Sequence, residues 1–362
     1  MQLKFLKTRV LPIGVDLGTS HLKMAQLQQV QQDFELLAAG SEEIPAELRS
    51  QESPRMDFIA QAIRRSLKSN SFQGRKCVLA LPASQLFLQH LKMPRVPAAD
   101  LDPMVRAELA GKFPYAVEDA VIGCVQAGEV FGEGEPRQEI IVAAAPRDVV
   151  EAYLEMAGKA RLEVVAINVE SCAIVECFGR LFRRNADLAR TILFIDLGVA
   201  STQVCLTQGE KLVFARNLRL GGQQIDQALA EGMHMDLAQA HGIRWDMQKG
   251  QNSEQAQEEI YRHLEELLSQ LASEITQCLR YYEATFRNQP VERMVLAGGQ
   301  AYDKRLCQSL AERLNLPAQI GDPLARIGRV AGAGLQIGLD RREPQPQWAV
   351  AVGLSLGAAQ AA

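Results

Sequence analysis

The sequence Ile13-Gly14-Val15-Asp16-Leu17-Gly18-Thr19-Ser20 returns in altered form as Leu193-Phe194-Ile195-Asp196-Leu197-Gly198-Val199-Ala200-Ser201-Thr202. In each copy an apolar, β-branched run ends in Asp-Leu-Gly and continues with small or hydroxylated residues, and a second apolar stretch follows. This pattern predicts a strand, a tight turn and another strand, twice. Such a turn offers backbone N–H groups and hydroxyls to an anion, and its aspartate can hold a hydrated Mg²⁺. Two of these turns facing each other would clamp the phosphates of a nucleotide.

A third segment follows further along the chain. The strand-like Met294-Val295-Leu296 runs into Ala297-Gly298-Gly299-Gln300-Ala301 and then into a helical stretch. Paired glycines at a strand end leave room for a flat ring against the backbone, which suits adenine and ribose. A single Asp-Leu-Gly segment would be typical of an ordinary hairpin turn. The paired turns followed by the Gly-Gly segment instead predict a nucleotide site.

With these segments the chain resembles the superfamily of actin, Hsp70 and sugar kinases, whose nucleotide cleft uses two phosphate loops and a Gly-Gly adenosine loop. Within it, the chain is similar to the PilM family of type IV pilus assembly proteins, relatives of the cell-division protein FtsA. The narrower likeness spans nearly the whole chain and rests on Val15 to Lys23, Lys92 to Pro97, Glu108, Lys112 to Tyr115, Arg219 to Gly222 and Trp348 to Leu354. The resemblance implies a duplicated, actin-like α/β fold. Two lobes with mixed sheets flanked by helices would enclose a nucleotide cleft, and a small 1C subdomain would be inserted in the first lobe.

The alternation of apolar strands and helices suggests how this fold divides the chain. We predict a first lobe (1A-like) over residues 1–85, an inserted 1C-like subdomain over 86–164, a second lobe (2A/2B-like) over 165–345, and a closing C-terminal helix of the first lobe over 346–362. Helices are expected near 56–68, 98–112, 147–160 and 170–181, and one long helix over 253–286. The apolar stripe of the long helix indicates core packing.

Composition limits the classes of partner. The 362 residues carry a net charge of −4 without a basic cluster, which argues against nucleic acid as a partner. No apolar run approaches the roughly 20 residues that span a bilayer. The last ten residues, 353–362, carry no charge, so no cationic membrane-surface helix is expected there. We therefore expect a cytoplasmic protein without direct membrane insertion, peripheral to the inner membrane through its protein partner. The oligomeric state stays open.

The resemblance also implies site residues. Asp16 and Asp196 are expected to hold Mg²⁺ through water. Lys23 matches a lysine common in the family, although strand alternation also allows a solvated side chain there. The remaining residues expected to bind ATP are Gly18, Thr19, Ser20, Gly198, Ser201, Thr202, Gly221, Gly222, Gly298 and Gly299.

The chain departs from the family at two places. By the resemblance, the family's Ala-Glu-x-x-Lys motif, which touches ribose and base, corresponds to Ala238-Gln239-Ala240-His241-Gly242, so Gln239 and Gly242 would replace two charged residues. Loss of charged partners weakens buried hydrogen bonds, although Arg244 could substitute. Asn168 stands where relatives often carry an acid, which leaves Glu170 as the nearest candidate for a catalytic base, or as a favourable charge at a helix N-terminus. We expect ATP binding without efficient hydrolysis, at most a weak ATPase.

The resemblance implies a nucleotide-binding scaffold of a type IV pilus or a related type II secretion or DNA-uptake machine. It would bind the cytosolic N-terminal tail of a PilN-like inner-membrane protein, near Pro94–Pro97 and the strand over 138–145. Other platform or motor proteins of the machine are further candidate partners. One alternative is a small-molecule phosphotransferase of the same superfamily, for which Asp100, Asp102, Glu118, Asp119 and Asp148 are available. Another alternative is a nucleotide-free adaptor.

Overall fold

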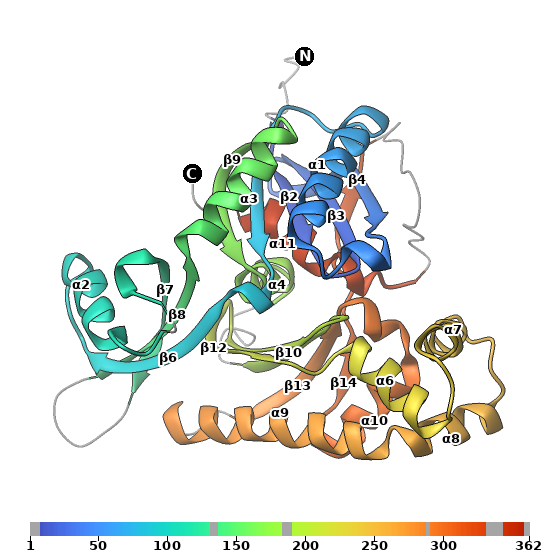
Figure 1. The fold of residues 1–362 in the computed structure, drawn as a ribbon. Helices are drawn as coiled ribbons and strands as arrows, with labels where there is room; N and C mark the ends of the chain where they lie inside the picture. Colours follow the sequence, from blue (N-terminus) through green and yellow to red (C-terminus); the bar gives the residue numbers. More distant parts are fainter. Residues whose placement is uncertain are drawn as a thin grey trace, which may run out of the picture.

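The computed structural model describes residues 8–113, 115–130, 137–182, 190–286, 290–330 and 343–357. Two lobes, each built on its own sheet, lie one above the other, and a small side domain extends from them (Figure 1).

The first sheet contains the first of the two predicted hairpins. Its strands are β1 (Thr8–Val10), β2 (Ile13–Leu17), β3 (His21–Val30), β4 (Asp33–Glu43), β5 (Lys76–Leu81), β9 (Glu163–Val169) and β15 (Ile327–Arg329). Their order is β15-β4-β3-β2-β5-β9, and β1 pairs with β3. Strands β2, β3 and β4 form an antiparallel meander, while β5 and β9 add in parallel beside β2.

The second sheet repeats this arrangement. Its strands are β10 (Thr191–Leu197), β11 (Thr202–Gln208), β12 (Lys211–Leu218), β13 (Val291–Ala297) and β14 (Ala318–Ile320), in the order β12-β11-β10-β13-β14. Again three antiparallel strands are followed by two parallel ones. The repeated order confirms the duplicated α/β fold that the two Asp-Leu-Gly segments predict.

Helices cover both faces of each sheet. Helices α4 (Glu170–Gly179) and α11 (Ala349–Gly357) lie between the two sheets, and α1 (Glu52–Ser69) and α3 (Arg147–Lys159) pack on the outer face of the first. Helices α6 (Gly222–Gly232), α9 (Glu265–Phe286) and α10 (Lys304–Leu314) cover the outer face of the second (Figure 1). Strand alternation decides which side chain enters which core: on β10, Phe194 belongs to the inner core and Ile195 to the outer.

Helix α11 approaches its neighbours at two glycines. A Cβ at Gly353 would stand 1.8 Å from the Ala173 carbonyl oxygen of α4, and a Cβ at Gly14 would stand 2.0 Å from the Ala351 carbonyl oxygen. The Ser355 hydroxyl donates to the Pro12 carbonyl at 2.8 Å and accepts from the Leu27 N–H at 3.1 Å. The expected closing helix is therefore α11, packed against β2 and α4; residues 358–362 of that expectation lie outside the described residues.

The side domain has its own sheet and core. Strands β6 (Phe87–Pro94), β8 (Arg137–Pro146) and β7 (Ala120–Val130) pair in that order, and α2 (Ala98–Leu109) packs on them. The predicted domain boundaries stay a prediction, but three elements bear on them. Helix α3, inside the predicted insertion, packs in the core of the first lobe, as does the start of β9. Strand β15, inside the predicted second lobe, pairs with β4 of the first sheet.

A buried polar cluster joins the side domain to the second lobe. Glu139 of β8, fully buried, accepts a hydrogen bond from the Tyr281 hydroxyl of α9 at 2.6 Å and lies 3.0 Å from His90 Nδ1 of β6. The other ring nitrogen of His90 lies 3.0 Å from the Ala215 carbonyl oxygen of β12, and the ring stacks on Phe214. These contacts fix the sheet of the side domain against the second lobe.

The long helix predicted over 253–286 is two helices, α8 (Glu254–His263) and α9, separated by a one-residue break at Leu264. The helix predicted over 98–112 ends at Leu109, shortly before Gly111, which has a φ of 76°. Among the described residues, no helix is both long and apolar enough to cross a membrane.

Candidate functional site

The two aspartates of the repeated segments point into the space between the sheets. On β2, Asp16 shares a face with Gly14, which contacts α11. On β10, Asp196 shares a face with Phe194 of the inner core. Because side chains alternate along a strand, the same spacing in both hairpins brings both carboxylates to the same side.

A cavity of about 700 Å³ opens between the lobes at this point. Most of the predicted site residues line it together. They are Asp16, Gly18, Thr19, Ser20, Lys23, Asp196, Gly198, Ser201, Gly298 and Gly299, with Glu170 from the start of α4. The volume lies in the range of roughly 300–1,000 Å³ that is usual for small-ligand sites.

Thr202, Gly221 and Gly222 are not among the lining residues, and they support the second loop from behind. The buried Thr202 hydroxyl donates to the Leu220 carbonyl at 2.7 Å. A Cβ at Gly221 would stand 2.7 Å from the Ser201 nitrogen, and the Gly222 N–H donates to the Gly198 carbonyl at 3.0 Å. These groups hold the loop over 198–201 in place.

Lys23 faces the cavity. It is the register partner of Asp16 across β2 and β3, and its Nζ donates to Asp16 Oδ2 at 2.9 Å. The second lobe has a neutral side chain at the matching place: Gln203 is the register partner of Asp196, and its Nε2 donates to Glu170 Oε2 at 2.9 Å. The two halves of the site therefore differ in charge.

The carboxylates in the cavity perturb one another. Burial, followed by the charges of Asp16 and Asp196, raises the pKa of Glu170 to about 8. Burial, followed by the charge of Asp16, raises the pKa of Asp196 to about 7. Negative charge therefore accumulates here as the pH rises through neutrality, and a cation would relieve the repulsion.

The described residues contain no group of three or more His, Cys, Asp or Glu side chains placed to hold a metal ion. A closed protein cage for a metal is thus not found in that part of the chain. Mg²⁺ is usually bound by one or two carboxylates together with water and substrate phosphates, an arrangement that Asp16 and Asp196 could provide.

Gly298 lies beside one of these carboxylates. Its φ is 87°, and a Cβ there would stand 2.5 Å from Asp196 Oδ1 and 2.4 Å from the Leu197 carbonyl oxygen. Glycine adopts this conformation without the steric penalty of other residues. The first glycine of the Gly-Gly segment therefore lets β13 turn directly past the end of β10.

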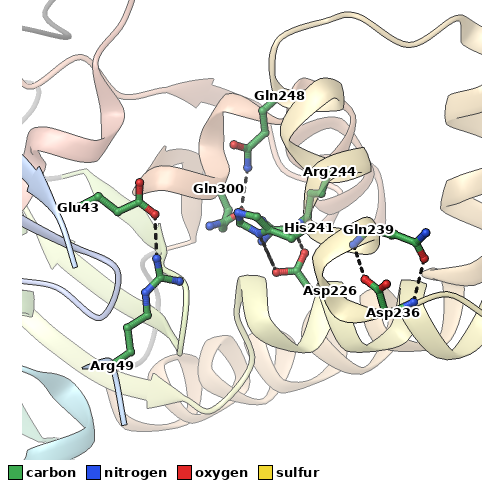
Figure 2. Close-up of polar contacts among 9 residues, drawn as sticks. All are labelled: Glu43, Arg49, Asp226, Asp236, Gln239, His241, Arg244, Gln248 and Gln300. Atoms are coloured by element: carbon green, nitrogen blue, oxygen red, sulfur yellow. Dashed lines mark hydrogen bonds and ion pairs between the residues drawn. The ribbon is translucent and has the colours of Figure 1, made fainter. Parts of the chain in front are cut away.

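Helix α7 (Leu237–Gln248) forms the wall on the side of the second lobe, where the structure corrects one expectation. Gln239 does not line the cavity. Its backbone N–H donates to Asp236 Oδ1 at 2.8 Å, and its Oε1 accepts from the Asp236 N–H at 3.1 Å, so the side chain caps the helix (Figure 2). Gly242 and Arg244 do line the cavity.

Arg244 is held in a buried network. Its guanidinium donates to Asp226 Oδ1 at 2.6 Å and Oδ2 at 2.7 Å, a bidentate pair, and also to Gln300 Oε1 (Figure 2). Gln248 Nε2 donates to the same Gln300 oxygen at 2.9 Å. A Cβ at Gly222 would stand 2.9 Å from Gln300 Nε2, so this glycine leaves room for the network.

Sequence reasoning missed several residues that line the cavity. On the first lobe, Arg49 pairs with Glu43 at 3.0 Å. The remaining ones include Asp226, His241, Trp245, Gln248, Lys249 and Gln300. The spacing of three and four residues within 238–249 is the signal that could have identified the face of α7.

Comparisons with known proteins agree with this architecture. The family model described as "Type IV pilus assembly protein PilM" matches residues 14–359. A solved "PilM-PilN type IV pilus biogenesis complex" is similar at 24% identity with a TM-score of 0.79, covering 96% of this chain and 98% of that one. The ethanolamine utilization protein EutJ from Carboxydothermus hydrogenoformans is similar at 14% identity with a TM-score of 0.57, covering 96% and 89%. The two structures show a shared, actin-like fold, and the family model shows that the chain belongs to the PilM family of type IV pilus assembly proteins.

Proposed function

We propose that the protein is a cytoplasmic scaffold of type IV pilus assembly, or of a related secretion machine, that binds ATP with Mg²⁺ between its lobes. The observation that supports this most is the meeting of two Asp-Leu-Gly turns and a Gly-Gly segment on one cavity. A shared cavity of this kind is what a phosphate clamp requires.

The lining residues fit such a ligand. Asp16 and Asp196 would hold Mg²⁺ through water, and the bound ion would neutralise phosphate charge. Backbone N–H groups and hydroxyls would meet the phosphates from Gly18, Thr19, Ser20, Gly198 and Ser201, and Lys23 would add a positive charge. Gly298 and Gly299 would border the adenosine, while Thr202, Gly221 and Gly222 would keep the second loop in shape.

Binding without efficient hydrolysis is the expected activity. Glu170 is the candidate that the sequence suggests for activating water, and its Oε2 already accepts a hydrogen bond from Gln203. With a pKa near 8 the carboxyl is largely protonated at neutral pH, so it cannot readily accept another proton. The acids considered for a phosphotransferase, Asp100, Asp102, Glu118, Asp119 and Asp148, do not line the cavity.

We propose that the scaffold binds the cytosolic tail of a PilN-like membrane protein in a second, apolar groove of about 310 Å³. The groove lies between β7 of the side domain and the end of β9, and residues such as Val121, Val125, Ile167 and Cys172 line it. In the described part of the chain, β7 and β9 each pair with a strand on one side only, so an extended peptide could add to an open edge. Strand β8 (Arg137–Pro146), which covers the 138–145 site suggested by the sequence, is paired on both edges and offers only its face.

The first test is calorimetric titration with ATP and Mg²⁺, repeated with Asp196→Ala. A matched control is Asp246→Ala, because Asp246 is exposed on α7 and does not line the cavity. Binding that is lost only in Asp196→Ala would support the site. If the wild-type protein did not bind ATP, nucleotide binding would be excluded and the alternative function, a nucleotide-free adaptor, would stand.

The second test measures binding of a synthetic peptide with the N-terminal sequence of the PilN-like protein from the same cell. Val121→Arg should abolish binding, because Val121 is 39% exposed in the groove and tolerates a charge without unfolding. Val10→Arg is the control, since Val10 is 38% exposed on an edge strand outside the groove. Equal binding by both variants would exclude this groove.

A further inference from the structure

Helix α7 presents two distinct faces. Ala240 and Met247 are buried in the core of the second lobe, and the buried Arg244 lies between the two faces and borders the cavity. The residues on the other face, spaced three or four apart, line the cavity: Ala238, His241, Gly242, Trp245, Gln248 and Lys249. This face does not contribute to a hydrophobic core, yet it carries a tryptophan and a glycine.

Trp245 is 50% exposed on this wall. Among the described residues, Trp245 is the single aromatic residue in the group of large, exposed hydrophobic side chains. The second tryptophan of the chain, Trp348, is buried, with 1% of its surface exposed. Lys249 Nζ lies 4.8 Å from the centre of the Trp245 ring. An aromatic face left open in a ligand cavity is suited to stacking against a nucleobase.

Gly242 lies one helical turn before Trp245 and has no structural need to be glycine. Its φ is not positive, and a Cβ there would meet no atom within 4 Å. A glycine inside a helix destabilises that helix relative to alanine. What the glycine provides is free space on the cavity side, next to the indole ring.

Polar atoms flank this space. Gln248 uses its Nε2 for Gln300, and His241 has its Nδ1 3.2 Å from Asp226 Oδ2 (Figure 2). In the part of the chain that the structure describes, no hydrogen bond is found for Gln248 Oε1 or His241 Nε2. Both lie on side chains that line the cavity, so they can meet the edge of a ring that stacks on Trp245.

The family resemblance already places ribose and base near the start of α7; we propose that other residues of its cavity face form the base-binding platform in this chain. The aromatic base of a nucleotide stacks on Trp245 over the space at Gly242, with Gln248 and His241 at its edge. This proposal rests on the proposed nucleotide binding and adds the part of the ligand that the phosphate loops do not recognise. The turns that bear Asp16 and Asp196 would then bind the triphosphate independently of the platform.

The test compares Mg²⁺-ATP with Mg²⁺-tripolyphosphate, which lacks the base and sugar, by calorimetry. Trp245→Ala should weaken ATP binding about 5- to 100-fold and leave tripolyphosphate binding unchanged. Trp245→Phe should retain most of the ATP affinity. Unchanged ATP binding by Trp245→Ala, or an equal loss for both ligands, would overturn the platform while leaving the phosphate site. A wild-type protein that binds neither ligand would overturn nucleotide binding itself.

Gly242→Ala gives an independent readout. Alanine favours the helix more than glycine does, so the substitution should raise the melting temperature. The added methyl group should weaken ATP binding, because it fills the space beside Trp245. Gly158→Ala on α3 is the matched control, because Gly158 is also an exposed helix residue whose Cβ would meet nothing within 4 Å. That control should stabilise the protein and leave ATP affinity unchanged. A Gly242→Ala protein that binds ATP as tightly as wild type would count against the platform.

Intrinsic fluorescence reports stacking directly. ATP should quench the emission of the wild-type protein, and the quench should vanish in Trp245→Phe, which keeps Trp348 as its single tryptophan. A quench that persists in Trp245→Phe would place the responding ring elsewhere and overturn the proposal.

Discussion

Glu170→Gln should make the stability of the ligand-free protein less dependent on pH. The neutral amide resembles the protonated carboxyl, and its oxygen can still accept from Gln203. The folded-state pKa of Glu170 is about 8, raised from 4.5 by burial and by Asp16 and Asp196. For an acid whose pKa is raised on folding, the stabilisation is complete below the unfolded pKa and is lost as the pH rises through the folded pKa.

The size of the pH effect follows from the difference between the unfolded and the folded pKa of Glu170. Each pH unit between the two pKa values is worth about 1.4 kcal/mol, so the carboxyl should lower the free energy of unfolding by about 3 kcal/mol between pH 5.5 and pH 8. Glu170→Gln should therefore match the wild type only near pH 4, below the unfolded pKa, and its advantage over the wild type should grow by about 3 kcal/mol between pH 5.5 and pH 8.5. A smaller slope should persist in the variant, because the pKa of Asp196 is also raised, to about 7.

Urea unfolding at several pH values, with a chelator present and at constant ionic strength, measures this difference. Glu151→Gln is the control, since Glu151 is exposed on α3. Curves of stability against pH that run parallel for wild type and Glu170→Gln would refute the reasoning, because they would mean that Glu170 keeps an ordinary pKa. Added Mg²⁺ should stabilise the wild type more at pH 8 than at pH 6, since the ion binds ionised carboxylates.

Three further substitutions test other parts of the structure. Gly353→Ala should lower the free energy of unfolding by about 3 kcal/mol in urea titrations, because the methyl would meet the Ala173 carbonyl at 1.8 Å; a loss under about 1 kcal/mol would contradict this packing. His90→Ala should destabilise by about 3 kcal/mol, because it removes a partner of the fully buried Glu139, and faster hydrogen exchange in β6 and β8 would locate the effect. Lys23→Met should weaken Mg²⁺-ATP binding about tenfold in calorimetry, whereas Lys76→Met, exposed on β5, should not; equal affinities would remove Lys23 from the site.

Much of the fold could be predicted because its signals are local. The sequence of each hairpin is an apolar run, a turn with glycine and a second apolar run. Because side chains alternate between the two faces of a strand, the positions of Asp16 and Asp196 fix the face on which they lie. The apolar stripe of the helix over 265–286 likewise reveals its buried side. The break at Leu264 was not visible, because the apolar spacing continues through it.

The site could be predicted only in part. The loops and the two aspartates follow from the repeated motif, but the residues of α7 were assigned by likeness to a family motif, which placed Gln239 in the cavity. The capping box with Asp236 fixes where α7 begins, and this start turns His241, Arg244 and Trp245 toward the ligand space instead. A helix rotates by about 100° per residue, so a shift of two positions moves a side chain to the opposite face.

The sequence by itself therefore determined the duplicated sheets, the two Asp-Leu-Gly turns and the family, because these depend on residues close together in the chain. Only the tertiary structure decided that Gln203 donates a hydrogen bond to Glu170, that α11 docks through Gly353, that β7 and the end of β9 border one apolar groove, and that Trp245 borders the cavity. Those contacts join segments tens to hundreds of residues apart. Their geometry is set by how the two sheets pack against the helices between them, which no local pattern encodes.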